Sequence, residues 1–371
     1  MKRIYFFGLI NIIYFFYLLP ASFAEHETIR IHCWKGYSKP YTDQFRELVK
    51  KKYKKDIRIV ITNVSNPEEF WTVSRRKKAD LISPAHNILK SRNGVFINKG
   101  VVLPVNLKNI TNYKFLLPIL QRNNFVTENN KVYGVPYTIG SYGLAYNSKK
   151  VTKPESWQVL WNEKNKKTYT ISKDYPDCNI YITALVLGAD YNLLYNYNQL
   201  MKQIPLLEFQ KKLNILSTNS FSMWKGTADY LEFPNLSYAA TWGYAVSKAN
   251  KNGGEWKMAT PIEGSTMWID HWAITQSVKD NPLKKILCEE WINYCLSPDL
   301  QVGVIRNWGV SPVVSNIEHL LTEDEIQIFK VGDTQYWKTL SLWENQGFDT
   351  VYGYKILWGR ALNVRKKSNI K

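Results

Sequence analysis

The chain has 371 residues, which corresponds to about two domains, and it is 45% hydrophobic and 14% aromatic. This composition buries a full core, so we exclude an intrinsically disordered protein. The formal net charge of +18 would suit nucleic acid or anionic lipid. However, the basic residues form short, dispersed clusters without any nucleic-acid-binding signature, so we expect a solvated basic surface and no nucleic-acid partner.

The first residues have the parts of a secretory signal. Lys2 and Arg3 form the positive start, residues 4–19 are almost entirely apolar, and small residues precede a cleavage site after Ala24. An uncleaved anchor is the alternative, but the run falls short of the ~20 residues that a membrane span needs. We predict cleavage after Ala24 and no lipid anchor, because no cysteine lies at the junction. Cleavage removes two basic and no acidic residues, so the charge falls from +18 to +16.

The next part of the chain alternates strand and helix patterns. Residues 29–33, 57–61 and 79–82 predict strands, with a helix over 41–53 and a capped helix that opens at 66–69. Such alternation predicts a parallel α/β sheet, whose ligands bind at the carboxyl ends of strands.

Three side chains follow these predicted strands directly. They are Trp34, Tyr37 and His86, and we expect them to line the crevice at the strand ends.

Residues 133–147 differ from these predicted strands, because glycines and a proline interrupt an aromatic, β-rich run. That composition fits a strand that crosses between two lobes and bends at glycine. Residues 308–312 resemble a second crossing or hinge.

The second half continues the alternation. Residues 157–161 predict the start of a helix, 169–172 a strand, 180–187 a helix after a turn, and 237–246 an aromatic strand that contains Trp242. Further helices are predicted over 283–296, from 297–299 onward, and over 343–362. Asp174 and Asp177 in the turn before residue 180 either cap that helix or face a cleft.

Trp268 and Asp270 are two residues apart on an extended segment, so their side chains point to the same side. An indole face beside a carboxylate suits an organic ammonium ion. A half-buried strand whose single acid meets water has the same pattern, and these two residues alone favour that interpretation.

The cysteines and the missing motifs limit the chemistry. Cys288 and Cys295 are seven positions apart on a predicted helix, about 10 Å along its axis, which is too far for a bridge. We interpret the four cysteines as buried small hydrophobic residues and leave one longer-range disulfide open. There is no G-x-S-x-G, H-E-x-x-H, P-loop or dinucleotide motif, and the five histidines lack a metal-ligand spacing. We therefore expect no enzyme, no metal and no cofactor.

A series of short motifs lies in order along nearly the whole mature chain. They are residues 33–37, 80–84, 135–137 leading to 143–147, 156–161, 268–270, and 291–294 before 297–299. Each motif is weak alone, but the series resembles the periplasmic spermidine/putrescine-binding proteins of ABC importers, in the extracellular solute-binding family. The resemblance implies a periplasmic monomer without catalysis, which delivers its ligand to permease subunits of an ABC transporter in the inner membrane.

The resemblance also implies a fold. It is an α/β, two-lobed periplasmic-binding-protein fold, type II-like, whose crossing hinge strands let the lobes close over a ligand. With residues 1–24 as the signal peptide, we expect residues 25–138 and 266–312 in lobe 1. Residues 139–265 and 313–371 are then expected in lobe 2.

In that family an aromatic box holds the methylene chain of a polyamine, and acidic side chains bind its ammonium groups. Trp34, Tyr37, Trp242 and Trp268 stand at matching box positions, and Asp270 stands at the matching acid. These residues imply a small-molecule amine as ligand.

The remaining expected ligand residues match the family less closely. They are Tyr137, Asp174, Asp177, Glu344 and His86. The acidic loop has diverged, with cysteine in place of one acid, and Glu344 falls where the family often has glutamine. The alternative is therefore the same fold with another solute, such as an amino acid, an organic anion or a different amine. The net charge of +16 also opposes a polycation, although salt screens it beyond ~8 Å.

Overall fold

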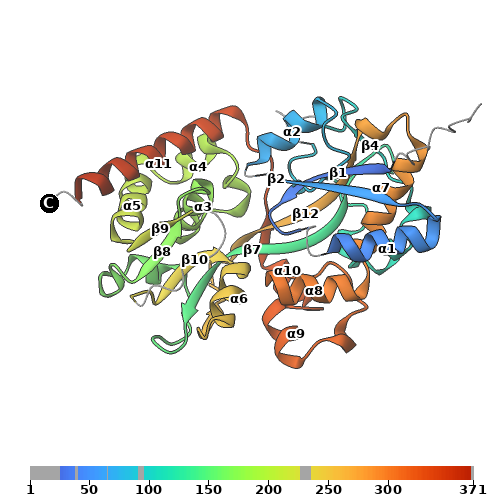
Figure 1. Ribbon diagram of the computed structural model, residues 1–371. Helices are drawn as coiled ribbons and strands as arrows, with labels where there is room; N and C mark the ends of the chain where they lie inside the picture. Colours follow the sequence, from blue (N-terminus) through green and yellow to red (C-terminus); the bar gives the residue numbers. More distant parts are fainter. Residues whose placement is uncertain (1–25, 38–40, 65, 91–95, 226–234, 369–371) are drawn as a thin grey trace, which may run out of the picture.

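The computed structural model describes residues 26–37, 41–64, 66–90, 96–225 and 235–368. The expected signal peptide lies outside these residues. Figure 1 shows two α/β halves side by side, with the long strands β7 and β12 running between them. These two strands therefore connect the two halves of the molecule.

The first half begins with a parallel sheet. Strand β1 (Glu27–Trp34) pairs in parallel with β2 (Ile57–Val64) and β3 (Leu81–Ile82). Helices α1 (Thr42–Tyr53) and α2 (Pro67–Arg75) connect them. The predicted order of strands and helices is confirmed here, because each crossover between parallel strands contains a helix.

Two long antiparallel strands join the halves. They are β7 (Val135–Asn147) and β12 (Ser265–Thr275), and every residue of β12 is buried. Among the described residues they lie at the centre of an 11-stranded sheet. Eight of its strands follow the order β2-β1-β3-β12-β7-β10-β8-β9, and the other three pair with β7 or β12 beside this path. The crossing strand predicted over residues 133–147 is therefore present. A strand covered on both faces explains the continuous apolar and aromatic run around Asp270.

The second half is built on β8 (Tyr169–Ser172), β9 (Ser222–Trp224) and β10 (Tyr238–Trp242). Helices cover this part of the sheet, and the C-terminal helix α11 packs against three of them (Figure 1). These four helices are α3 (Pro176–Val186), α4 (Tyr197–Gln203), α5 (Leu206–Asn219) and α11 (Phe348–Ser368).

The remaining elements are short or peripheral. They are β4 (Val102–Leu103), β5 (Thr127–Glu128), β6 (Lys131–Val132), α6 (Gly243–Lys251), β11 (Trp256–Met258), α7 (Pro282–Cys295), α8 (Pro298–Trp308), α9 (Glu323–Phe329), α10 (Thr334–Lys338) and β13 (Leu340–Leu342). Short 3-10 helices span Leu107–Asn109, Thr111–Phe115, Pro118–Leu120, Trp157–Trp161, Glu163–Asn165, Tyr191–Leu193, Gln276–Val278 and Glu318–Leu320.

Three predicted elements differ from the structure. The strand predicted over residues 237–246 ends at Trp242, and α6 follows because Ala245, Val246 and Ala249 form a buried helical face. Residues 157–161 form only a 3-10 helix. The C-terminal helix begins at Phe348 rather than 343, because the preceding β13 pairs with β12 instead.

The hydrophobic cores show which segments pack together. One core draws on residues 29–139 and 267–331, and another on residues 142–259 and 354–361. Val313, Val314, Ile317 and Val331 belong to the first core, although the expected division assigned them to lobe 2. The lobe boundary stays a prediction, and this packing favours a lobe 1 that includes residues 313–331.

Gln301 explains why the segment after α8 stays with the first core. Its side-chain amide donates to the carbonyl oxygen of Tyr137 at 3.1 Å, and its side-chain oxygen accepts from the Val313 N–H at 2.9 Å. Ser311 also exchanges backbone hydrogen bonds with Ile139 of β7. The segment 308–312, expected to be a crossing or hinge, therefore lies alongside the crossing strand.

Other sequence expectations concern the cysteines and metals. All four cysteines are buried and unbridged in the structure. The described part of the chain contains no cluster of three or more His, Cys, Asp or Glu side chains that could hold a metal ion. No helix among the described residues has the length and apolar character of a membrane span.

Candidate functional site

Asp270 lies in the crossing strand β12 and is only 6% exposed. The hydroxyl of Tyr37 donates a hydrogen bond of 2.6 Å to its Oδ2, and the nearby Trp34 side chain, like Tyr37, favours the ionised form of the carboxyl. The Tyr37 hydroxyl lies 3.1 Å from Oγ1 of Thr138 on β7. The rings of Tyr37 and Tyr137 pack edge to face, with their centroids 5.2 Å apart. The loop after β1 is therefore fixed to both crossing strands through Asp270 and its neighbours.

The electrostatic environment of Asp270 is unusual for a carboxylate. Burial raises its pKa to about 7, and the hydrogen bond from Tyr37 and the nearby Trp34 side chain act in the opposite direction. No ion pair joins Asp270 to a lysine, arginine or histidine within the described residues. A desolvated carboxylate without a cation is costly, so a positive charge brought beside Asp270 would stabilise its ionised form.

Aromatic rings from both halves gather around Trp242, at the end of β10. Its ring centroid lies 5.0 Å from Tyr142, 5.3 Å from Tyr175, 6.0 Å from Trp343, 6.3 Å from Trp224 and 6.5 Å from Trp268. Trp242 and Trp343 each pack against both hydrophobic cores. We call the rings of this paragraph the aromatic cluster, and it lies where the two halves meet.

Gly140 allows Trp268 to lie across the neighbouring strand. The two residues are partners in the register between β7 and β12. A Cβ atom on Gly140 would lie 2.6 Å from Cζ2 of the indole, which is closer than atoms approach without a shift. The glycine predicted to relax a crossing strand therefore also makes room for an aromatic side chain beside Asp270.

His86 holds the C-terminal segment against β12. The Ile269 N–H donates to Nδ1 at 3.2 Å, so Nε2 carries the proton and donates to the carbonyl oxygen of Trp343 at 2.6 Å. Burial lowers the pKa of this imidazole to about 4, and the two backbone hydrogen bonds oppose that shift. The expected contact between His86 and a ligand remains a prediction, and both ring nitrogens are already engaged within the protein.

The other expected acids lie in different surroundings. Asp177 is partly buried and accepts a hydrogen bond of 3.2 Å from the Gln346 amide, while burial raises its pKa. Asp174 and Glu344 are exposed. The structure therefore brings Trp34, Tyr37 and Tyr137 to Asp270 and connects Trp268 to Trp242, whereas it leaves Asp174 and Glu344 exposed and pairs Asp177 with Gln346.

Sequence reasoning missed four members of the aromatic cluster, namely Tyr142, Tyr175, Trp224 and Trp343. Tyr175 follows the carboxyl end of β8, and burial raises its pKa to about 12, with the Asp270 charge adding to the shift. The strand-end rule that selected Trp34 would have found Tyr175 as well. Trp343 follows β13, whose parallel pairing with β12 has no local signal in the sequence.

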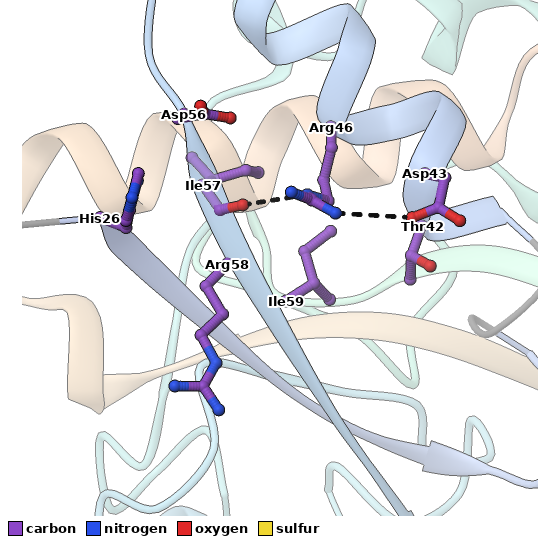
Figure 2. Close-up of a pocket in the computed structure, with 8 residues that line it drawn as sticks. All are labelled: His26, Thr42, Asp43, Arg46, Asp56, Ile57, Arg58 and Ile59. Carbon is purple, nitrogen blue, oxygen red and sulfur yellow. Dashed lines mark hydrogen bonds and ion pairs between the residues drawn. The ribbon is translucent and has the colours of Figure 1, made fainter.

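Two surface hollows lie elsewhere on the molecule. Figure 2 shows one of about 380 Å³ between α1 and the start of β2, where Arg46 bonds to the carbonyl of Ile57 at 3.1 Å and pairs with Asp43 at 3.6 Å. The other, of about 660 Å³, is lined by the exposed side of α1 itself. Neither contains any residue expected to bind ligand, so we assign no function to them.

Comparisons with known proteins identify the family. Residues 76–340 match the model of the bacterial extracellular solute-binding proteins. The chain belongs to this family. It is 23% identical over 282 residues to the spermidine/putrescine-binding periplasmic protein 1 of Haemophilus influenzae, covering 70% of this chain and 69% of that protein.

Solved structures of other solute-binding proteins share the fold. The spermidine/putrescine substrate-binding protein PotD of Streptococcus pneumoniae has a TM-score of 0.73 at 19% identity, over 91% of this chain and 99% of that one. MotA of A. tumefaciens, solved in complex with glucopine, has a TM-score of 0.64 at 15% identity, over 91% of this chain and 99% of that one. These likenesses confirm the expected periplasmic-binding-protein fold, and at such identities they show the fold alone.

Proposed function

We propose that this solute-binding protein captures an organic cation between its two lobes and delivers it to the permease subunits of an ABC transporter. A polyamine of the spermidine/putrescine kind is the candidate that the named relatives support. The observation that carries the proposal is Asp270, which is buried, forms no ion pair within the described residues and lies near the Trp34 side chain.

The physical chemistry of this site favours a cation. When lobes close over a ligand they exclude water, and an ammonium group then offsets the cost of the buried carboxylate. Indole faces such as those of Trp268 and Trp242 add cation–π attraction, about 2 kcal/mol for a desolvated contact. Trp34, Tyr37, Trp242, Trp268 and Asp270 form the ligand set that we propose.

The cellular setting follows the same reasoning. We propose that residues 1–24 are removed after Ala24 and that the mature protein works in the periplasm as a monomer, without catalysis and without a cofactor. The family and the periplasmic relative support this setting. The basic surface does not need a nucleic-acid partner, because the charges are dispersed along the chain.

A second candidate is the same fold with a different solute, such as an amino acid or an organic anion. The structural likeness to a protein solved with glucopine supports it, because that complex shows that the fold accommodates other ligands. The exposed Lys35 beside the strand-end loop is a cation that such a ligand could use.

Isothermal titration of the mature protein separates these candidates. The panel contains putrescine, spermidine, simple monoamines, amino acids and organic anions, after native mass spectrometry has checked for a retained ligand. We expect amine binding that Asp270→Asn abolishes, whereas Asp280→Asn, at an exposed site, leaves it unchanged. Binding restricted to anions and unaffected by Asp270→Asn would overturn the proposal.

A further inference from the structure

The number of carboxylates available to a ligand limits the charge of that ligand. A diamine has two ammonium groups, and each needs an anionic or strongly polar partner once water is excluded. Asp270 supplies one partner. The other acids expected to bind ligand are Asp174, Asp177 and Glu344, of which Asp177 is the most enclosed.

Asp177 is directed into the interior of its own half. It accepts a hydrogen bond from the Gln346 amide, which also donates to the hydroxyl of Tyr181. Burial raises the pKa values of Tyr181 and Tyr354, which lie in the core between α3 and α11, and the charge of Asp177 adds to both shifts. The carboxylate therefore belongs to the contact between α3 and the C-terminal segment, and it appears in none of the contacts of the aromatic cluster.

The other two expected acids are exposed, so water already stabilises their charge. Asp174 precedes α3, and Glu344 lies in the segment before α11. An exposed carboxylate interacts with a cation in a high dielectric, where the attraction is about 1 kcal/mol at 4 Å. Such groups do not replace a desolvated partner for a second ammonium group.

The hydrogen-bond capacity of Asp270 also favours a ligand whose cationic head has few N–H donors. One oxygen of its carboxylate already accepts the Tyr37 hydroxyl, which leaves only part of its acceptor capacity for a ligand. A primary ammonium group brings three N–H donors that all need acceptors, whereas an alkylated ammonium group brings charge with few or no donors. Aromatic rings satisfy an alkylated ammonium through cation–π contact, and Trp34, Trp268 and Trp242 supply them from both halves.

We infer that the ligand carries a single cationic head of the alkylated ammonium class, bound at Asp270 among the rings of the aromatic cluster. This inference rests on the proposed function and narrows it. The named relatives point to polyamines, whereas among the expected ligand acids, all of which lie in the described residues, only Asp270 is buried beside Tyr37 and free of an acceptor role toward Gln346. The net charge of +16 on the mature chain favours the same outcome, because repulsion grows with the charge of the ligand.

Matched ligands test the inference by isothermal titration at pH 8. The probes are butyltrimethylammonium, n-butylamine and putrescine, which share a four-carbon chain and differ in the number and alkylation of their charges. We expect butyltrimethylammonium to bind at least about tenfold more tightly than either n-butylamine or putrescine, a difference that titration resolves easily. Putrescine binding as tightly as butyltrimethylammonium, or more tightly, would overturn the inference.

Two variants separate this inference from the proposed function. Asp270→Asn should abolish binding of all three probes, and if it changes none of them the proposed function fails together with the inference. Asp177→Asn should leave the ratio of the butyltrimethylammonium and putrescine affinities unchanged. A selective loss of putrescine in Asp177→Asn, with amine binding still dependent on Asp270, would overturn the inference alone. Thermal unfolding of each variant checks that it is folded.

Discussion

The hydroxyl of Tyr37 lies 2.6 Å from Oδ2 of Asp270, although the two residues are 233 positions apart in the sequence. This hydrogen bond joins the loop after the first strand to the crossing strand that both lobes share. It also lowers the pKa of Asp270 against the effect of burial. One tyrosine thus helps to keep the proposed ammonium-binding carboxylate ionised and in position.

Replacing this tyrosine should weaken ligand binding. Tyr37→Phe removes a hydrogen bond to a charged group, worth about 1.5–3 kcal/mol, so we expect amine affinity to fall about tenfold or more. Titration should also show the loss of binding at higher pH than in the wild type, because the pKa of Asp270 rises. Tyr352→Phe, on the exposed side of α11, is the matched control. Unchanged affinity and pH profile in Tyr37→Phe would contradict the prediction.

Ligand affinity should depend on pH through Asp270. The pKa of this carboxyl in the free protein is about 7, and a cation binds its ionised form. We therefore expect affinity for butyltrimethylammonium, whose charge is independent of pH, to be constant above pH 8. Below pH 7 it should fall by about tenfold per pH unit. Affinity that increases as the pH falls would contradict this assignment.

Asp270 should destabilise the ligand-free protein at neutral pH. Its folded-state pKa of about 7 is above the ordinary 3.8, so the folded state holds the proton more tightly. The resulting stabilisation is present below pH 3.8 and is lost as the pH rises through 7, by about 4 kcal/mol. Asp270→Asn should therefore unfold at a higher temperature than the wild type at pH 8 and lose this advantage near pH 4.

Asp280→Asn, at an exposed site, is the control for this stability measurement and should leave the unfolding temperature unchanged. The wild-type sample must be free of retained ligand, because a bound cation would stabilise the ionised carboxylate. Lower stability of Asp270→Asn than wild type at pH 8 would show that the carboxylate is not desolvated as the structure indicates.

Much of the fold and part of the site follow from local sequence rules. Trp34 and Tyr37 are predicted to line the crevice because they follow a strand, whereas Trp268 and Asp270 share a side of a strand but are ligand candidates through the family resemblance. The crossing strand was recognised from glycines in an aromatic run, of which Gly140 proves to face an indole. These features depend on neighbours that are close in the sequence.

The contacts that the sequence did not predict depend on partners that are distant along the chain. His86 follows a strand, but its hydrogen bonds come from residues 269 and 343. The direction of Asp177 depends on Gln346, which lies 169 positions away. Trp343 reaches the aromatic cluster only because β13 pairs with β12. No periodicity within a short window contains this information.

Gly140 should be needed for the position of Trp268. Gly140→Ala brings a Cβ within 2.6 Å of the indole, so the ring must shift from its place against β7. We expect amine affinity to fall about tenfold or more, with a stability cost of about 1–3 kcal/mol from overpacking. Gly359→Ala, in α11 with nothing within 4 Å of the new methyl group, is the control. Wild-type affinity in Gly140→Ala would show that Trp268 does not need this position.

His86 should make the protein sensitive to acid. Its folded-state pKa of about 4 is below the ordinary 6.5, so the unfolded state binds a proton that the folded state does not. The stability that depends on neutral His86 is present above pH 6.5 and is lost towards pH 4, by about 3 kcal/mol. His86→Gln does not titrate in this range, so its stability should decline less between pH 6.5 and pH 4. Urea unfolding at several pH values measures this difference.

The buried His271, whose pKa is lowered to about 3, contributes acid sensitivity in the same direction, so some decline will remain in His86→Gln. His319→Gln, at an exposed site, is the matched control and should keep the full wild-type dependence. Because the His86 imidazole donates to the Trp343 carbonyl, His86→Phe should in addition loosen that tryptophan and weaken amine binding. If His86→Gln and His319→Gln show the same pH dependence as the wild type, the buried, neutral imidazole is not what holds the C-terminal segment against the crossing strand.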